Sequence, residues 1–141
     1  PMQWNSNSFA GFSCVDPWIG LNPNYSKINV ENDINSDFSI HDYYKKLIKY
    51  RKGNEIVRDG DFKEIGLEDS DIFSYTRTYK GKTLLVLGSF SDKKVCYNMP
   101  NNLQKFKREL VISNYNGNIE QNKDASTLYL RPYEALVFYM Y

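Results

Sequence analysis

The spacing of apolar residues along the chain changes at Gly53. Before this point, apolar side chains recur at intervals of three and four residues: Ile40, Tyr43, Tyr44, Leu47 and Ile48. This spacing predicts one amphipathic helix with a single apolar stripe. Ser39 and Asp42 stand where a capping box has its first and last residues, and Gly53 is placed to end the helix. A lone helix with such a stripe needs a large apolar partner.

After Gly53 the chain reads as short strands separated by turn residues. Two are expected within residues 55–66, and the clearest hairpin pairs 71–79 with 83–90 across Lys80-Gly81. Further strands are predicted at 93–99, 108–115, 126–130 and 134–141, with no helix between them. This spacing is typical of an antiparallel β-sandwich or barrel. Residues 134–141 are apolar on both faces, so this strand is predicted to be central.

The first 37 residues predict a loop. Prolines, glycines and asparagines interrupt any regular period, and large aromatic side chains are spread among them. Loops of this composition usually cover a rim or cleft that another part of a protein builds. We therefore expect the loop and the helix after it to be the end of a domain whose remainder lies outside this chain.

Composition narrows the classes of partner. The formal net charge is +1, from 18 basic and 17 acidic residues, which argues against nucleic acid or a membrane surface held by bulk electrostatics. No apolar run approaches the roughly 20 residues of a membrane span, and no signal peptide is recognisable. Cys14 and Cys96 lack metal-ligand or redox spacing, so we expect free, buried thiols in a cytoplasmic protein.

The titratable residues do not assemble a catalytic motif. His41 is the only histidine and lies in the first turn of the predicted helix. The acidic residues between the strands are expected to be solvated turn residues, since nothing apolar surrounds them: Asp59, Asp61, Glu68, Asp69 and Asp71. Gly81-Lys82-Thr83 lacks the first glycine and the helix of a phosphate loop. We predict no catalytic residue, no metal site and no cofactor.

Several segments resemble one family. "PMQW", "AGFS", "PWIGLNPNY" and "INVE", followed by "SIHDYYKKLIKYRK", resemble the end of the catalytic barrel in glycoside hydrolase family 13 α-glucosidases. These include oligo-1,6-glucosidases, dextran glucosidases and trehalose-6-phosphate hydrolases. The remainder, with "LRPYEA", resembles their C-terminal domain. The resemblance implies a mainly β fold: an antiparallel Greek-key β-sandwich over 54–141, preceded over 1–53 by the last loop and last helix of a (β/α)8 barrel.

The resemblance also implies a reaction. The family hydrolyses α-glucosidic bonds with retention, using carboxylates that it places on barrel strands upstream of Pro1. An arginine two residues before Pro1 also belongs to the family's sugar site, and Asn5 stands where the family usually has aspartate. We therefore expect the isolated chain to be inactive. Gln3 and Trp4 are the predicted substrate-binding residues at the rim, while Phe12 and Trp18 are expected to clamp the loop to the barrel.

The leading hypothesis is a non-catalytic C-terminal portion of an α-glucosidase, with the upstream barrel as partner and a gluco-oligosaccharide as the substrate of the whole protein. Isomaltose, dextran ends and trehalose 6-phosphate all remain open as substrates. A stand-alone carbohydrate-binding module is the alternative, and an oligonucleotide-binding barrel is weaker because no basic face is expected. Without the barrel, the helix stripe is expected to fold back onto the sandwich or to form a dimer. Tyrosines are expected to fill the sandwich core and the interface: Tyr75, Tyr79, Tyr97, Tyr115, Tyr129 and Tyr133.

Overall fold

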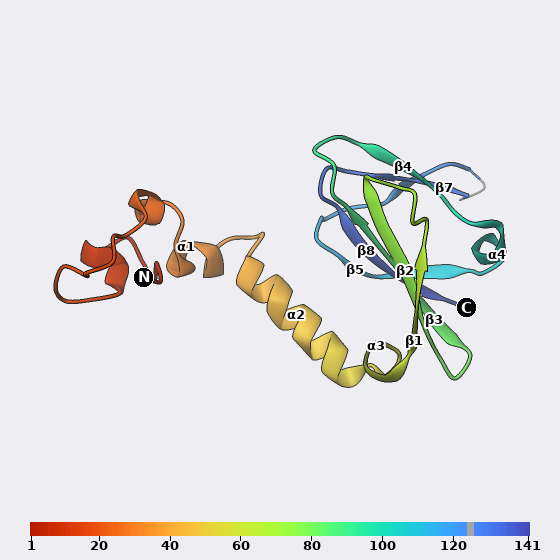
Figure 1. Cartoon of the computed structure of the whole chain (residues 1–141), viewed down its shortest axis with the longest axis horizontal. Coiled ribbons are helices and arrows are strands. Elements are labelled where there is room, and N and C mark those ends of the chain that lie inside the picture. The colour runs from red at the N-terminus through yellow and green to blue at the C-terminus, as the bar shows by residue number, and fades with distance from the viewer. Residues whose placement is uncertain (124–125) are drawn as a thin grey trace. The chain divides into compact units, whose positions relative to one another are not determined.

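The computed structural model describes residues 1–123 and 126–141. The chain forms two compact units, residues 1–50 and residues 51–141, which are described separately (Figure 1). The first unit is built of loops and helices, and the second contains all the strands of the described chain. The boundary lies in the last turns of the predicted helix.

The first unit holds two 3-10 turns and a short helix before the long one. The turns are η1 (Ser8–Gly11) and η2 (Pro23–Ser26), and the helices are α1 (Val30–Ile34) and α2 (Ile40–Gly53). The long helix is confirmed with the predicted ends. Helix α1 was not predicted; it forms because the Asn29 side chain accepts a hydrogen bond from the Asn32 amide at 2.8 Å, as an N-cap.

The N-terminus of α2 is capped by two residues. The Ser39 hydroxyl accepts from the Asp42 amide at 3.1 Å, which is the first half of the predicted capping box. The second half differs, because the Asp42 carboxylate lies 3.1 Å from His41 Nδ1. Asp33 supplies the other acceptor: its carboxylate takes the amides of Ile40 (2.9 Å) and His41 (3.0 Å) and the Ser39 hydroxyl (3.1 Å). The backbone hydrogen bonds from His41 and Ile40 lower the pKa of Asp33.

The apolar stripe of α2 is uncovered in this chain. No residue of the helix is buried, and the side chains of Ile40, Tyr44 and Ile48 are more than half exposed. The predicted periodicity is therefore present without the apolar partner that it calls for.

The second unit is an antiparallel β-sandwich. One sheet has the order β1-β2-β3-β8-β5 and the other the order β4-β7-β6, and every pairing is antiparallel. The strands are β1 (Asp61–Ile65), β2 (Ile72–Tyr79), β3 (Lys82–Ser89), β4 (Val95–Asn98), β5 (Arg108–Ser113), β6 (Glu120–Gln121), β7 (Thr127–Leu130) and β8 (Ala135–Met140). The mainly β prediction is confirmed, as are the β2–β3 hairpin and the central place of β8 between β3 and β5.

Two predicted segments are wrong. Residues 55–59 form helix α3 (Glu55–Asp59) instead of a strand, because the Asn54 side chain caps it by accepting from the amides of Ile56 and Val57. A further short helix, α4 (Asn101–Gln104), lies between β4 and β5, where no helix was expected. It begins after Pro100 and buries Leu103 against the sandwich core.

The core between the sheets is aliphatic rather than tyrosine-rich. Leucines of both sheets meet there, among them Leu85 and Leu136 on one side and Leu128 and Leu130 on the other, all fully buried. Tyr97 is the only one of the expected tyrosines that is buried; Tyr133 is exposed and the others are half-buried. Burial raises the pKa of Tyr97. The prediction of a tyrosine core is therefore wrong for every position except this one.

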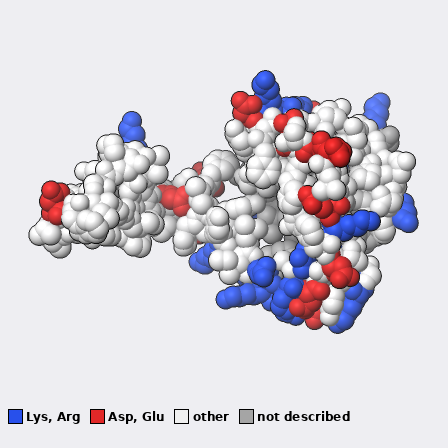
Figure 2. All heavy atoms as spheres, in the orientation of Figure 1, with Lys and Arg blue, Asp and Glu red and all other residues white. Residues whose placement is uncertain are grey.

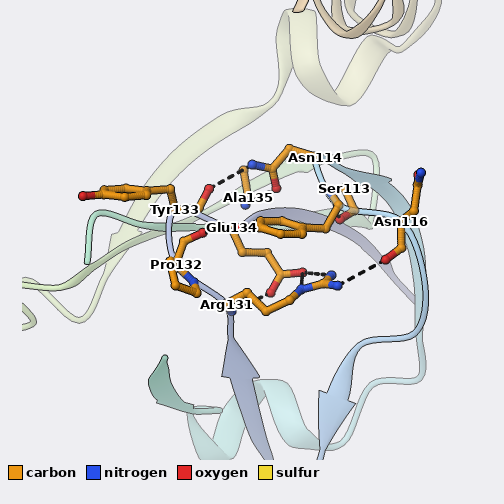
Figure 3. Close-up of polar contacts among 9 residues, drawn as sticks. Ser113, Asn114, Asn116, Arg131, Pro132, Tyr133, Glu134 and Ala135 are labelled. Carbon is orange, nitrogen blue, oxygen red and sulfur yellow. Dashed lines mark hydrogen bonds and ion pairs between the residues drawn. The ribbon is translucent and has the colours of Figure 1, made fainter. Parts of the chain in front are cut away.

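A buried ion pair closes the turn between β7 and β8 (Figure 3). The Glu134 side chain, 1% exposed, pairs with the Arg131 guanidinium and also accepts from the Arg131 backbone amide at 2.8 Å. Arg131 Nη1 donates to the Asn116 carbonyl oxygen at 3.1 Å, and its guanidinium carbon lies 4.2 Å from the centre of the Tyr115 ring. These contacts join the turn to the segment after β5. Glu134 raises the pKa of Arg131.

Removing one member of this pair should destabilise the second unit strongly. In Arg131→Met the Glu134 carboxylate stays buried without its cation, which costs about 3–5 kcal/mol of unfolding free energy. Urea unfolding of the 141-residue chain measures the change. The double variant Arg131→Met/Glu134→Leu should recover much of the loss, since it leaves no buried charge. A loss below about 1 kcal/mol in the single variant would place the pair in the solvated class of ion pairs.

The cap of α2 should weaken in acid. Because the folded state lowers the pKa of Asp33, its contribution is complete above the unfolded value near 3.9 and is lost as pH falls through the lower folded value. Hydrogen exchange should show reduced protection of the Ile40 and His41 amides at the low-pH end of that window. Asp33→Ala should give the same loss at neutral pH, with Asp37→Ala as the matched control. Unchanged protection in Asp33→Ala would contradict this role.

Candidate functional site

The N-terminal loop is fastened to α1 through its backbone. The carbonyl oxygens of Gln3 and Trp4 accept hydrogen bonds from the amides of Val30 (2.9 Å) and Glu31 (3.0 Å). These amides lie in the first turn of α1, where backbone donors have no partner within the helix. The start of α1 therefore fixes the position of the two predicted substrate-binding residues.

The side chain of Gln3 is engaged within the loop. Its amide nitrogen donates to the Asn24 side-chain oxygen at 3.0 Å and to the Ile28 carbonyl oxygen at 2.5 Å. Both acceptors belong to the segment around η2, so Gln3 joins two parts of the loop that are more than 20 residues apart in sequence. The amide nitrogen is thereby fixed, and the amide oxygen is the end of the side chain that points away from these contacts.

Trp4 and Gln3 line the same pocket. Its volume is about 510 Å³, and its other lining residues include Met2, Ile28 and Val30. The Trp4 side chain is about half exposed, at 49%. One face of a large aromatic ring therefore lies open beside an amide, which is a pairing suited to a sugar ring and its hydroxyl groups.

A strained turn holds the backbone of Trp4. Phe9, Ala10 and Gly11 all have positive φ angles, of 54°, 56° and 64°. For the two residues with side chains, this conformation costs on the order of 1–3 kcal/mol each. The Ala10 carbonyl oxygen accepts from the amides of both Trp4 (2.9 Å) and Asn5 (3.2 Å), so the turn determines where these two residues lie. Sequence analysis treated this segment as ordinary loop; the Ala10-Gly11 step was its one visible signal.

Glycine is required at position 11. A Cβ atom there would lie 2.6 Å from the Asn5 side-chain nitrogen, besides adopting an unfavourable φ. The Asn5 side chain is itself fixed, since its oxygen accepts from the Asn7 amide at 3.0 Å. Asn5, which stands where the resemblance leads one to expect aspartate, thus serves as a turn residue in this chain.

The two aromatic residues expected to clamp the loop are uncovered. Trp18 is 94% exposed and Phe12 is about half exposed. Asp16 is the only charged side chain among residues 1–26, and the N-terminal loops carry few charges on the face shown in Figure 2. Ala10 is the only buried hydrophobic residue among residues 1–50. Surfaces that are apolar, uncharged and uncovered to this degree are typical of interfaces.

The acidic residues considered in the sequence do not gather into a site. Asp59 pairs with Arg58 at 2.8 Å, and the hydrogen bond from Arg58 lowers the pKa of Asp59. The Asp69 side chain accepts from the amides of Asp71 and Ile72 and so shapes a turn. Within residues 1–123 and 126–141, no three His, Cys, Asp or Glu side chains lie close enough together to hold a metal ion. Cys14 and Cys96 are free but exposed, whereas burial was expected.

No helix in the described part of the chain combines the length and the apolar character needed to cross a membrane.

Comparison with known proteins divides the chain at nearly the same place as its fold. Residues 1–60 match the family model described as "Alpha amylase, catalytic domain", and residues 72–137 match "Alpha-amylase SusG C-terminal domain". An oligo-1,6-glucosidase of Bacillus cereus is 43% identical over 138 residues, which are 98% of this chain and 24% of that protein. A trehalose-6-phosphate hydrolase of Bacillus subtilis is 32% identical over 140 residues, again 98% of this chain and 24% of that protein.

Solved structures agree. The trehalose-6-phosphate hydrolase of Bacillus licheniformis superposes with a TM-score of 0.89 at 30% identity, over 99% of this chain and 25% of that one. The trehalulose synthase of Pseudomonas mesoacidophila gives 0.89 at 27% identity, over 100% and 25%. The chain thus spans about a quarter of the length of these relatives. The two family models and these matches together show that the chain belongs to glycoside hydrolase family 13.

Proposed function

We propose that this chain is the C-terminal portion of a retaining α-glucosidase that hydrolyses α-1,6-linked or related gluco-oligosaccharides. The observation that carries the proposal is the 43% identity to an oligo-1,6-glucosidase across 98% of the chain. In this assignment residues 1–53 complete the catalytic barrel. Residues 54–141 form a separate β-domain that packs on the barrel and stabilises it.

The uncovered surface of the first unit supports a barrel as its partner. Large apolar side chains are exposed all along it, at 48–94% of their full area: Trp4, Phe12, Trp18, Phe38, Ile40 and Tyr44. Each such side chain gains about 1.5–3 kcal/mol on full burial, so a partner that covers several of them would bind this unit strongly. The other family members supply such a partner in the three quarters of their length that this chain does not match.

The second unit offers its own aromatic surface. Phe62 on β1 and Phe73 on β2 are about half exposed, and the Tyr75 ring lies 5.0 Å from the first and 5.5 Å from the second, between ring centres. A cluster of this kind on the β1–β2 side of the five-stranded sheet is suited to contact with another domain.

The residues of this chain would bind and orient substrate rather than carry out the bond cleavage. Retaining hydrolysis needs two carboxyl groups about 5 Å apart, one of them protonated. The buried or capping carboxylates described above are already committed, Asp33 to α2 and Glu134 to Arg131. Trp4 would stack on a sugar ring at the rim, and the Gln3 amide oxygen would accept a hydrogen bond from a hydroxyl group. The strained Phe9–Gly11 turn would hold Trp4 in place before substrate arrives.

We also place the protein in the cytoplasm. Both cysteines are free thiols on the surface, a state that a reducing compartment maintains.

A chimera tests the proposed activity. The matching 138 residues of the Bacillus cereus oligo-1,6-glucosidase would be replaced by this chain. We expect the chimera to hydrolyse isomaltose with a kcat/KM within about tenfold of the parent enzyme, and the isolated chain to show no turnover. Trp4→Ala should raise KM about tenfold through loss of stacking, whereas Trp18→Ala should lower stability and leave KM unchanged. A folded, monodisperse chimera without α-glucosidase activity would overturn the proposal.

The exposed stripe of α2 generates a separate test. We propose that in the isolated chain Tyr43, Tyr44, Leu47 and Ile48 are buried between two copies, since no residue of α2 is buried within one copy. Sedimentation should then show a dimer whose dissociation constant rises at least about tenfold in Ile48→Glu. Lys49→Glu, the next residue along the helix, is the matched control and should leave the dimer intact. A monomer at all accessible concentrations would refute dimerisation.

A further inference from the structure

The second unit contains a groove that the proposed function leaves without a role. Its volume is about 840 Å³, larger than that of the pocket beside Trp4. It lies where α4, the start of β5, the segment before β6 and the C-terminal end meet (Figure 1). Reciprocal backbone hydrogen bonds between Lys107 and Tyr141, of 2.8 and 2.9 Å, hold two of these segments together.

Two amide side chains in the groove are each held at one end. The Gln104 nitrogen donates to the Met99 carbonyl oxygen at 2.7 Å and to the Asn101 side-chain oxygen at 3.3 Å. The Gln121 oxygen accepts from Arg108 Nη2 at 2.7 Å. The opposite ends, an acceptor on Gln104 and a donor on Gln121, are thereby oriented in advance. A donor and an acceptor fixed in one groove match a pair of sugar hydroxyl groups, each of which can donate and accept.

Aromatic and planar side chains complete the lining. Phe106 and Tyr141 line the groove and are partly exposed, and the Arg108 guanidinium carbon lies 5.7 Å from the centre of the buried Phe138 ring. Burial lowers the pKa of Arg108. Such flat apolar surfaces stack on the faces of pyranose rings. No carboxylate belongs to the described lining, so the groove does not suit a cation.

We propose that this groove is an accessory binding site for an uncharged α-linked gluco-oligosaccharide, separate from the rim loop at Gln3 and Trp4. The amides and aromatic rings define a neutral, hydroxyl-rich ligand; its assignment as a gluco-oligosaccharide rests on the proposed function. A site of this kind would hold a polymer or oligomer end on the β-domain while another part of the protein acts on it. Affinity gained in this way comes from a raised local concentration of substrate.

Titration of the 141-residue chain with isomaltotriose, followed by amide NMR shifts, tests the proposal. We expect saturable shifts at residues 104–108 and 117–121, with an affinity that is insensitive to salt because the ligand is uncharged. Gln121→Ala and Phe106→Ala should each weaken binding about fivefold, as expected for one lost hydrogen bond or one lost stacking contact. Phe62→Ala removes an exposed ring elsewhere in the same unit and should leave binding unchanged. Thermal unfolding of each variant confirms that the sandwich is intact.

Other outcomes would overturn the proposal. Absence of saturable shifts in the folded chain would exclude the site. Binding that is lost in Trp4→Ala but kept in Gln121→Ala would place the sugar at the rim loop. Salt-sensitive binding of glucose 6-phosphate alone would assign the groove to an anion through Lys107 and Arg108. None of these results decides whether the chimera is active, so the accessory site and the proposed hydrolysis fail independently.

Discussion

The first unit is built under one constraint: it has almost no apolar core of its own. Ala10 is its only buried hydrophobic residue, while Trp18, Phe38 and Ile40 are mostly exposed. Hydrogen bonds therefore define its shape, from the Gln3 and Trp4 carbonyls on α1 to the Asp33 carboxylate on α2. Because each such bond contributes only about 1 kcal/mol net, this unit depends on a partner for most of its stability.

The second unit meets the opposite condition. Its two sheets bury a continuous cluster of leucine, isoleucine, methionine and phenylalanine side chains, and its one deeply buried carboxylate, Glu134, is paired with Arg131. A fold of this kind carries its own stability. It can therefore brace the loop-rich unit and offer surfaces, such as the groove near Arg108, without losing its fold.

Sequence periodicity predicted the elements whose pattern is local. The α2 stripe, the Lys80-Gly81 hairpin and the central β8 all follow from spacing within one segment. Helices α3 and α4 escaped because five and four residues are too few for a period, and because a single side chain, Asn54, decided the first of them. The groove could not be predicted either, since Gln104 and Gln121 become neighbours of one cavity only after the sandwich has formed.

The role of the candidate site is best judged from how its geometry is maintained. A loop held mainly by apolar contacts with a partner would lose its shape without that partner. Here the Phe9–Gly11 turn accepts two backbone amides, Gln3 reaches Asn24, and Trp4 caps α1, all within residues 1–31. The backbone strain at Phe9 and Ala10 is offset locally rather than by the partner. The rim residues are thus positioned by their own segment, which lowers the ordering cost of binding a sugar at Trp4.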